Sequence, residues 1–225
     1  MKKQLALLLC GIMLLGTGCG AGSSADNSTA ENSTAENSAA ESSAASESSA
    51  AEQSSAEMKE STEDGLTIRA AADVDEAYIP LLRKYFKAIE SEDYDTYLTV
   101  LYPPFKDAFS AYVESMEGDE TLKDVFSDVC NRFDEDGYES WKLTTLEMEN
   151  MPEGGIDIEG FFDSYINAGY FDESLKKECL ENAEDIQDIR FRLYALYEGD
   201  EKPVKVVDDN AIIVLKTKDG AYLFG

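Results

Sequence analysis

The chain contains no histidine among its 225 residues, so its chemistry depends on Asp, Glu, Tyr, Lys and Cys. Without imidazole, the sequence excludes Ser-His-Asp and Cys-His nucleophilic sites and zinc sites that use histidine ligands. Two paired carboxylates can hydrolyse a glycoside, but among 47 Asp and Glu residues the spacing singles out no pair. There is also no glycine-rich loop of the kind that holds phosphate. We therefore assign no catalytic residue, no cofactor and no metal ligand.

Two of the four cysteines, Cys130 and Cys179, lie in the part of the chain that we expect to fold. Outside the cytoplasm such a pair often forms a disulfide, and here the bond would close a loop of about 50 residues and contribute roughly 4 kcal/mol. The alternative is two buried free thiols that pack as small hydrophobic side chains. The sequence leaves both open, and neither thiol is expected to be catalytic because no histidine is present to activate it.

A short acidic segment that contains Asp134, Asp136 and Gly137 has some features of a calcium loop. An EF-hand with this glycine at its sixth position needs an acidic residue at positions 132 and 143. The chain has Arg132 and Leu143 there. We interpret the segment as a turn at the end of a helix.

The N-terminus has the order of a secretory signal peptide over residues 1–18, with a basic tip, an apolar run from Leu5 to Leu15 and three small residues. The next residue is Cys19, and this ending resembles the lipobox of bacterial lipoproteins. The resemblance implies that the Cys19 thiol receives a diacylglycerol and that Cys19 becomes the first residue of the mature protein. One departure is Gly16, where a lipobox usually has leucine. The apolar run is shorter than the about 20 residues that a spanning helix needs.

The lipobox resemblance places the protein on the outer face of a bacterial cytoplasmic membrane, held there by its lipid. The alternative is an ordinary signal peptide, cleaved near Gly18 or Gly20 without lipid. Residues 19–65 are nearly all Ala, Ser, Glu, Asn and Thr, and they include no Val, Ile, Leu or aromatic residue. Such a segment cannot bury enough apolar surface to offset the entropy of ordering its backbone, so we expect a disordered tether.

Residues 66–225 have the length of one domain. Apolar residues recur at helical spacing in six segments, which are 78–89, 94–101, 105–116, 122–133, 158–166 and 173–183. Strands are expected at 141–148, 189–198, 204–207, 211–217 and 222–224, with turns at 199–200, 208–210 and 219–220. We expect Trp141 and Phe191 in the core. The order predicts an α+β fold in which N-terminal helices pack on a C-terminal antiparallel sheet.

Three features are similar to the NTF2-like, cystatin-like α+β fold that many lipoproteins of Gram-positive gut bacteria carry. They are a long first helix with a Glu-Asp-Tyr break at 92–94 into a second helix, the end of that helix at Tyr102 and Pro103, and the final hairpin over 211–224. The resemblance covers residues 74–104 and 187–225. It implies a curved sheet wrapped around a helix, with a cone-shaped cavity, and it implies no particular reaction.

The formal net charge of −28 repels phosphate polymers, so we expect no nucleic-acid partner. Basic proteins, divalent cations and neutral glycans are compatible partners, although solubility alone also explains the charge. We predict a non-catalytic ligand-binding or interaction module of the cell envelope, which contacts the membrane through its N-terminal lipid and an unknown envelope ligand or protein through its domain. The alternative is an extracytoplasmic enzyme of NTF2-like type that uses carboxylate or Tyr residues in a cavity. A cavity filled by the protein's own aromatic side chains would favour the module.

Overall fold

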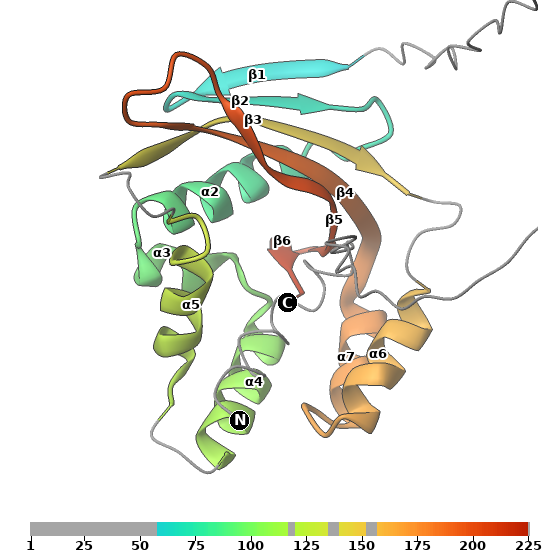
Figure 1. The fold of residues 1–225 in the computed structure, drawn as a ribbon. Helices are drawn as coiled ribbons and strands as arrows, with labels where there is room; N and C mark the ends of the chain where they lie inside the picture. The colour runs from blue at the N-terminus through green and yellow to red at the C-terminus, as the bar shows by residue number, and fades with distance from the viewer. Residues whose placement is uncertain (1–57, 117–119, 135–139, 152–156, 225) are drawn as a thin grey trace, which may run out of the picture. The chain divides into compact units, whose positions relative to one another are not determined.

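A six-stranded sheet is the framework of the domain, and its strands lie side by side in sequence order (Figure 1). The computed structural model describes residues 58–116, 120–134, 140–151 and 157–224. In these ranges the strands are β1 (Lys59–Glu63), β2 (Leu66–Ala70), β3 (Trp141–Asn150), β4 (Ala183–Tyr197), β5 (Val204–Thr217) and β6 (Gly220–Leu223). Neighbours run antiparallel except β2 and β3, which are parallel. A parallel pair needs a long crossover, and the helical segment between β2 and β3 supplies it.

Six helices lie in the described ranges, and each coincides with a segment of predicted helical spacing. They are α2 (Tyr78–Glu90), α3 (Tyr94–Val100), α4 (Pro103–Ser115), α5 (Leu122–Cys130), α6 (Ile158–Asn167) and α7 (Glu173–Asn182). The helix predictions are therefore confirmed. Pro103 and Pro104 separate α3 from α4 and form the first turn of α4, where a missing backbone N–H leaves no intrahelical hydrogen bond unmade.

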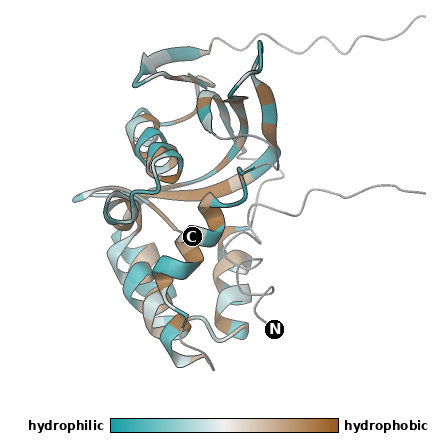
Figure 2. Ribbon diagram, turned by 60° about the vertical axis from the view of Figure 1, so that its left-hand side comes forward, coloured by the Kyte–Doolittle hydropathy of each residue, from teal (hydrophilic) through white to brown (hydrophobic). Residues whose placement is uncertain are grey.

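The strands and helices turn their apolar sides toward one another. Along β4 the side chains of Phe191, Leu193, Ala195 and Tyr197 are buried, whereas the residues between them are only partly so, as the alternation predicts. Figure 2 shows hydrophobic and hydrophilic residues interspersed along the helices and strands. The apolar face of α2 lies under the sheet (Figure 1).

The α+β class is confirmed, but the order of elements differs from the prediction. Two strands, β1 and β2, precede the helices, and β3 lies between α5 and α6 in the sequence. The sheet is therefore mixed, with one parallel pair, and is not a C-terminal antiparallel sheet alone. The sheet is curled around α2, which is compatible with an NTF2-like architecture (Figure 1).

Ordered structure begins before Leu66, where we placed the end of the tether. Strand β1 pairs with β2 over five residues, and Asp64 and Gly65 form the turn between them with φ values of 50° and 77°. Both values are positive, as in the type I′ turns that often close two-residue hairpins. The prediction of a tether is wrong for residues 58–65, and residues 19–57, including Cys19, lie outside the described ranges.

A buried arginine fixes this hairpin to α2. Arg83 is only 6% exposed, and its guanidinium donates to the backbone oxygens of Ser61 (2.9 Å) and Glu63 (2.9 Å) and to that of Leu66. It also donates to Ser61 Oγ at 3.1 Å. Because a buried cation needs hydrogen-bond acceptors, these contacts explain why Arg83 tolerates burial.

The turn predicted at 208–210 is wrong, because β5 continues through these residues as one strand. Asp209 takes a φ of 56°, and the pairing with β4 shifts register here, as at a bulge. Arg190 Nη1 lies 3.2 Å from Asp209 Oδ2, and Arg192 Nε lies 3.8 Å from Asp208 Oδ1. Arg190 and Arg192 of β4 therefore offset the negative charge of the two aspartates on β5, for which a turn had been predicted.

The turn predicted at 219–220 forms, but one residue earlier. Thr217 pairs with Gly220, so the two loop residues are Lys218 and Asp219. Gly220, with a φ of 149°, is the first residue of β6.

Two clusters of buried side chains use opposite faces of β5. Ile212 and Val214 belong to the cluster between α2 and the sheet, which we call the α2 cluster. Ile213 and Leu215 belong to a second cluster with residues of α4, α6 and α7, which we call the α4–α7 cluster. Since successive strand residues point to opposite faces, β5 is covered on both sides over this stretch.

Candidate functional site

The concave side of the sheet, where the resemblance implied a cavity, is occupied by the protein's own side chains. The ring centroid of Phe86 on α2 lies 5.2 Å from that of Phe191 on β4 in an edge-to-face contact. Tyr97 and Phe126 have their centroids 4.6 Å apart nearby. All four residues belong to the α2 cluster and are at most 3% exposed. This region is a packed core that aromatic rings hold together.

The α4–α7 cluster is organised around Phe224, which follows β6. Its side chain is 0% exposed, and its ring contacts four others. The centroid distances are 4.5 Å to Phe105, 4.7 Å to Phe162, 5.7 Å to Phe161 and 5.8 Å to Phe171. The end of the chain therefore joins α4 to α6 and to the loop between α6 and α7.

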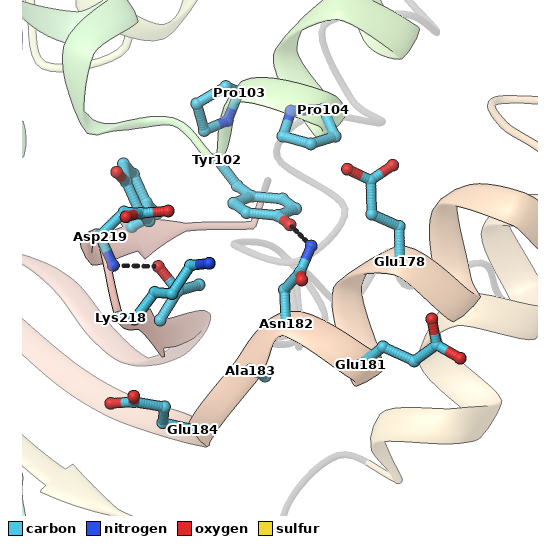
Figure 3. A pocket seen from close by; sticks show the side chains of 12 residues that line it. Tyr102, Pro103, Pro104, Glu178, Glu181, Asn182, Ala183, Glu184, Lys218 and Asp219 are labelled. Atoms are coloured by element: carbon cyan, nitrogen blue, oxygen red, sulfur yellow. Dashed lines mark hydrogen bonds between the residues drawn. The ribbon is translucent and has the colours of Figure 1, made fainter.

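A polar pocket of about 580 Å³ opens beside this cluster, between α4, the end of α7 and the turn between β5 and β6 (Figure 3). Its volume is in the range of small-ligand sites, about 300–1,000 Å³. Pro103 and Pro104 form one wall, and Glu178, Glu181 and Asn182 of α7 form the opposite one. Lys218 and Asp219 close the third side. We take this pocket as the candidate site.

Tyr102 lies at the centre of the pocket, and three contacts fix it. Its backbone N–H donates to the carbonyl oxygen of Leu223 on β6 at 2.8 Å. Its hydroxyl oxygen accepts from Asn182 Nδ2 at 3.3 Å, and its ring meets Tyr222 edge-on with centroids 5.8 Å apart. The residue is 4% exposed. Tyr102 is thus held by α7 and β6 while its side chain lines the pocket (Figure 3).

Burial raises the pKa of the Tyr102 hydroxyl, and the nearby charge of Glu178 adds to the effect. The phenol therefore stays protonated at neutral pH and cannot act as a general base or nucleophile there. Among the described residues the hydroxyl has one hydrogen bond, which it accepts from Asn182, so its own hydrogen is not donated to an acceptor. This hydroxyl is suited to donate to an acceptor atom of a bound molecule.

Carboxylates dominate the charge of the pocket. Glu178, Glu181, Glu184 and Asp219 line it, and Lys218 is the one cation among its lining residues. Within the described ranges, Glu178 and Glu184 have no salt-bridge partner, whereas Glu181 has Lys177 at 3.7 Å on the exposed side of α7. The side chains can accept hydrogen bonds from amines, amides or hydroxyl groups. The pocket therefore favours a ligand that is rich in donors and positively charged.

The cysteines singled out from the sequence do not contribute to this pocket. Cys130 and Cys179 are free and buried, and they lie in different clusters, so the candidate disulfide is not formed. Burial raises the pKa of the Cys130 thiol to about 11 and that of Cys179 to about 12. Both thiols remain protonated at neutral pH, which makes them poor nucleophiles.

The acidic segment that starts at Asp134 is partly described. Asp134 Oδ1 accepts from Trp141 Nε1 at 2.9 Å, so this carboxylate is used within the protein, and residues 135–139 lie outside the described ranges. Across the described residues no group of three or more Cys, Asp or Glu side chains is arranged to hold a metal ion. The same part of the chain contains no helix long and apolar enough to cross a membrane.

No functional role was predicted for Tyr102, Glu178 or Asn182. Two signals were present. Tyr102 directly precedes the Pro-Pro pair that begins α4, and Glu178, Glu181 and Asn182 are spaced by three and four residues, which places them on one face of a helix. Their meeting depends on the tertiary fold, which brings the end of α7 to Tyr102, and neither pattern predicts that contact. Comparisons with protein-family models, with curated proteins and with solved structures give no match.

Proposed function

We propose that this chain is a non-catalytic ligand-binding or interaction module, anchored through a lipid on Cys19 to the outer face of a bacterial cytoplasmic membrane. The anchor is supported by the basic, apolar and small residues that precede Cys19. The binding role is supported by one observation above all. The concave side of the sheet, where an enzyme of NTF2-like type would hold its substrate, contains Phe86 against Phe191.

The pocket around Tyr102 supports binding more than catalysis. Its phenol is protonated at neutral pH, and burial raises the phenol's pKa further; burial also raises the pKa of the nearby Cys179 thiol, which is protonated too. The four carboxylate residues that line it are exposed, whereas general acids and bases are usually tuned by burial. The pocket therefore offers fixed hydrogen-bond groups without an activated nucleophile.

The anchor is tested by fractionating cells that express the native chain or Cys19→Ala. We expect the native chain in the membrane fraction and Cys19→Ala in the soluble extracytoplasmic fraction, because acyl chains supply the membrane affinity. A Cys19→Ala protein that still pellets with membranes would contradict the proposal.

The binding role is tested by incubating the purified chain with soluble fragments of the cell envelope and analysing the mixture by mass spectrometry. We expect fragments to be retained and recovered chemically unchanged, with retention reduced in Tyr102→Phe. Chemical conversion of a fragment that disappears in Glu178→Gln would instead support the enzyme alternative.

A further inference from the structure

A second pocket extends the first along α4. It has a volume of about 460 Å³ and lies between α4 and the segment from Gly169 to Glu178. Pro104 and Glu178 line both pockets, so the two meet there. We call the combined surface the α4–α7 groove. It runs from the turn between β5 and β6, past Tyr102, to the turn between α6 and α7.

The α4 side of the groove is a regular strip. Pro104, Ala108, Ala111, Tyr112 and Ser115 line it, and their spacing of three and four residues places them on one helical face. At about 1.5 Å per residue, this strip is roughly 16 Å long. An extended peptide rises about 3.3 Å per residue, so the strip matches about five residues. The small alanines let a backbone approach α4 closely.

The opposite side is acidic along its length, and at one end of the groove aromatic rings of the two sides meet. Tyr112 and Tyr170 meet edge-on with centroids 4.5 Å apart, and both line the groove with Phe171. Burial raises the pKa of Tyr170 to about 12, so this end presents neutral rings and hydroxyl groups. Aromatic rings of this kind bind aliphatic stems and the cations that the stems carry.

The charge of the lining residues indicates which class of molecule the groove would bind. Its lining includes five carboxylates, which belong to Asp172, Glu178, Glu181, Glu184 and Asp219, and Lys218 is the one cation. Asp172 already accepts from the backbone N–H groups of Ser174 and Leu175, but Glu178, at the meeting point of the two pockets, has no salt-bridge partner among the described residues. The groove attracts cations and repels anions.

The protein's own N-terminal segment does not suit this groove. Residues 20–57 contain acidic residues and no Lys or Arg, so the carboxylates of the groove would repel them. A second copy of the acidic chain meets the same objection. The ligand of the groove must therefore be a different molecule that carries positive charge.

We propose that the α4–α7 groove binds an extended peptide segment of about five residues that carries lysine or arginine side chains. This inference rests on the proposed binding function and names the class of ligand. A ligand ammonium group would pair with Glu178 at the centre of the groove. A peptide carbonyl would accept from the Tyr102 hydroxyl, and the aliphatic stems would lie on Tyr112 and Tyr170.

The test is isothermal titration of the full-length chain, purified in detergent, with capped pentapeptides of sequence Ala-Lys-Ala-Lys-Ala. We expect one peptide to bind per chain, with affinity at least about tenfold weaker when the lysines are acetylated, because charge-assisted hydrogen bonds are lost. Raising the salt from about 50 to about 500 mM should weaken binding as well. Glu178→Gln should weaken binding about tenfold.

The matched control is Glu173→Gln, which removes the same charge from an exposed residue of α7 outside the groove. We expect its affinity to stay within about twofold of the native value, because Glu173 lines neither pocket and salt screens exposed charges that do not contact the ligand. Equal losses in Glu173→Gln and Glu178→Gln would show general attraction to an acidic surface and overturn the proposal. So would an absence of peptide binding.

A parallel titration uses neutral N-acetylated chitotetraose. If this sugar binds, loses affinity in Tyr102→Phe, and the lysine peptide does not bind, then the groove takes a neutral glycan. That result overturns the peptide proposal and leaves the proposed binding function intact. If neither molecule binds, the peptide proposal is overturned, and the binding function is judged by retention of envelope fragments.

Discussion

Replacing Phe224 by alanine should destabilise the domain strongly, although Phe224 is the penultimate residue of the chain. The side chain is fully buried and contacts four rings from α4, α6 and the loop before α7. Phe-to-Ala changes at such positions cost about 3–5 kcal/mol. That is a large part of the roughly 5–15 kcal/mol that stabilises a domain. For a domain of this size, a loss of about 4 kcal/mol lowers the melting temperature by roughly 8–16 °C.

The assay is urea denaturation followed by far-UV circular dichroism, with a thermal melt on the same samples. Phe224→Leu keeps most of the volume and should cost less, about 1.5 kcal/mol. Leu180→Ala is the control, because Leu180 lies on α7 but is 37% exposed. Leu180→Ala should change the free energy of unfolding by no more than about 0.5 kcal/mol, as is usual for surface positions. If Phe224→Ala unfolds within about 1 kcal/mol of the native protein, then Phe224 does not organise the α4–α7 cluster and our reasoning is wrong.

Three further predictions concern the edge of the sheet, pH and the thiols. A chain that begins at Leu66 should be about 1–3 kcal/mol less stable by urea denaturation than one that begins at Met58, because Arg83 loses the oxygens of Ser61 and Glu63; equal stability would show that β1 adds nothing. The Ala77 N–H and Lys216 lower the pKa of Asp75, so the contribution of this carboxylate to stability is present at neutral pH and is lost as pH falls below about 4. The difference in unfolding free energy between the native protein and Asp75→Asn should therefore shrink from pH 7 to pH 3, and a constant difference would contradict this. Cys130 and Cys179 should react with a thiol reagent only after unfolding, since both are buried and protonated at neutral pH; rapid labelling of the folded chain would show that a thiol is accessible.

Helical spacing identified all six described helices because each buries one apolar face. Helix α2, for example, places Tyr78, Leu82, Phe86 and Ile89 against the sheet, and these residues recur at three and four positions. Strand β1 gave no such signal, because it is an edge strand whose residues are almost all exposed. Its pairing depends on the Asp64-Gly65 turn and on Arg83 from a distant helix. Such a strand cannot be inferred from apolar alternation.

The features that the sequence did not predict depend on contacts between residues far apart in the chain. The parallel pairing of β2 with β3 joins residues far apart in the chain, and no local pattern encodes it. Phe191 is in the core as predicted, but Trp141 is only half-buried, because its indole N–H reaches Asp134 at the surface. The candidate site depends on the same kind of contact, since Tyr102 and Asn182 are separated by 80 positions and meet only after α7 packs near α4.

Strand β5 packs against a separate cluster of buried side chains on each of its two faces. Ile212 and Val214 face the α2 cluster, and Ile213 and Leu215 face the α4–α7 cluster. Substitutions deep within one cluster should therefore add independently to substitutions in the other, while changes in β5 should couple the two. Exposed positions of α4 and α7 that line the groove can therefore change while the buried side chains of both clusters stay as they are.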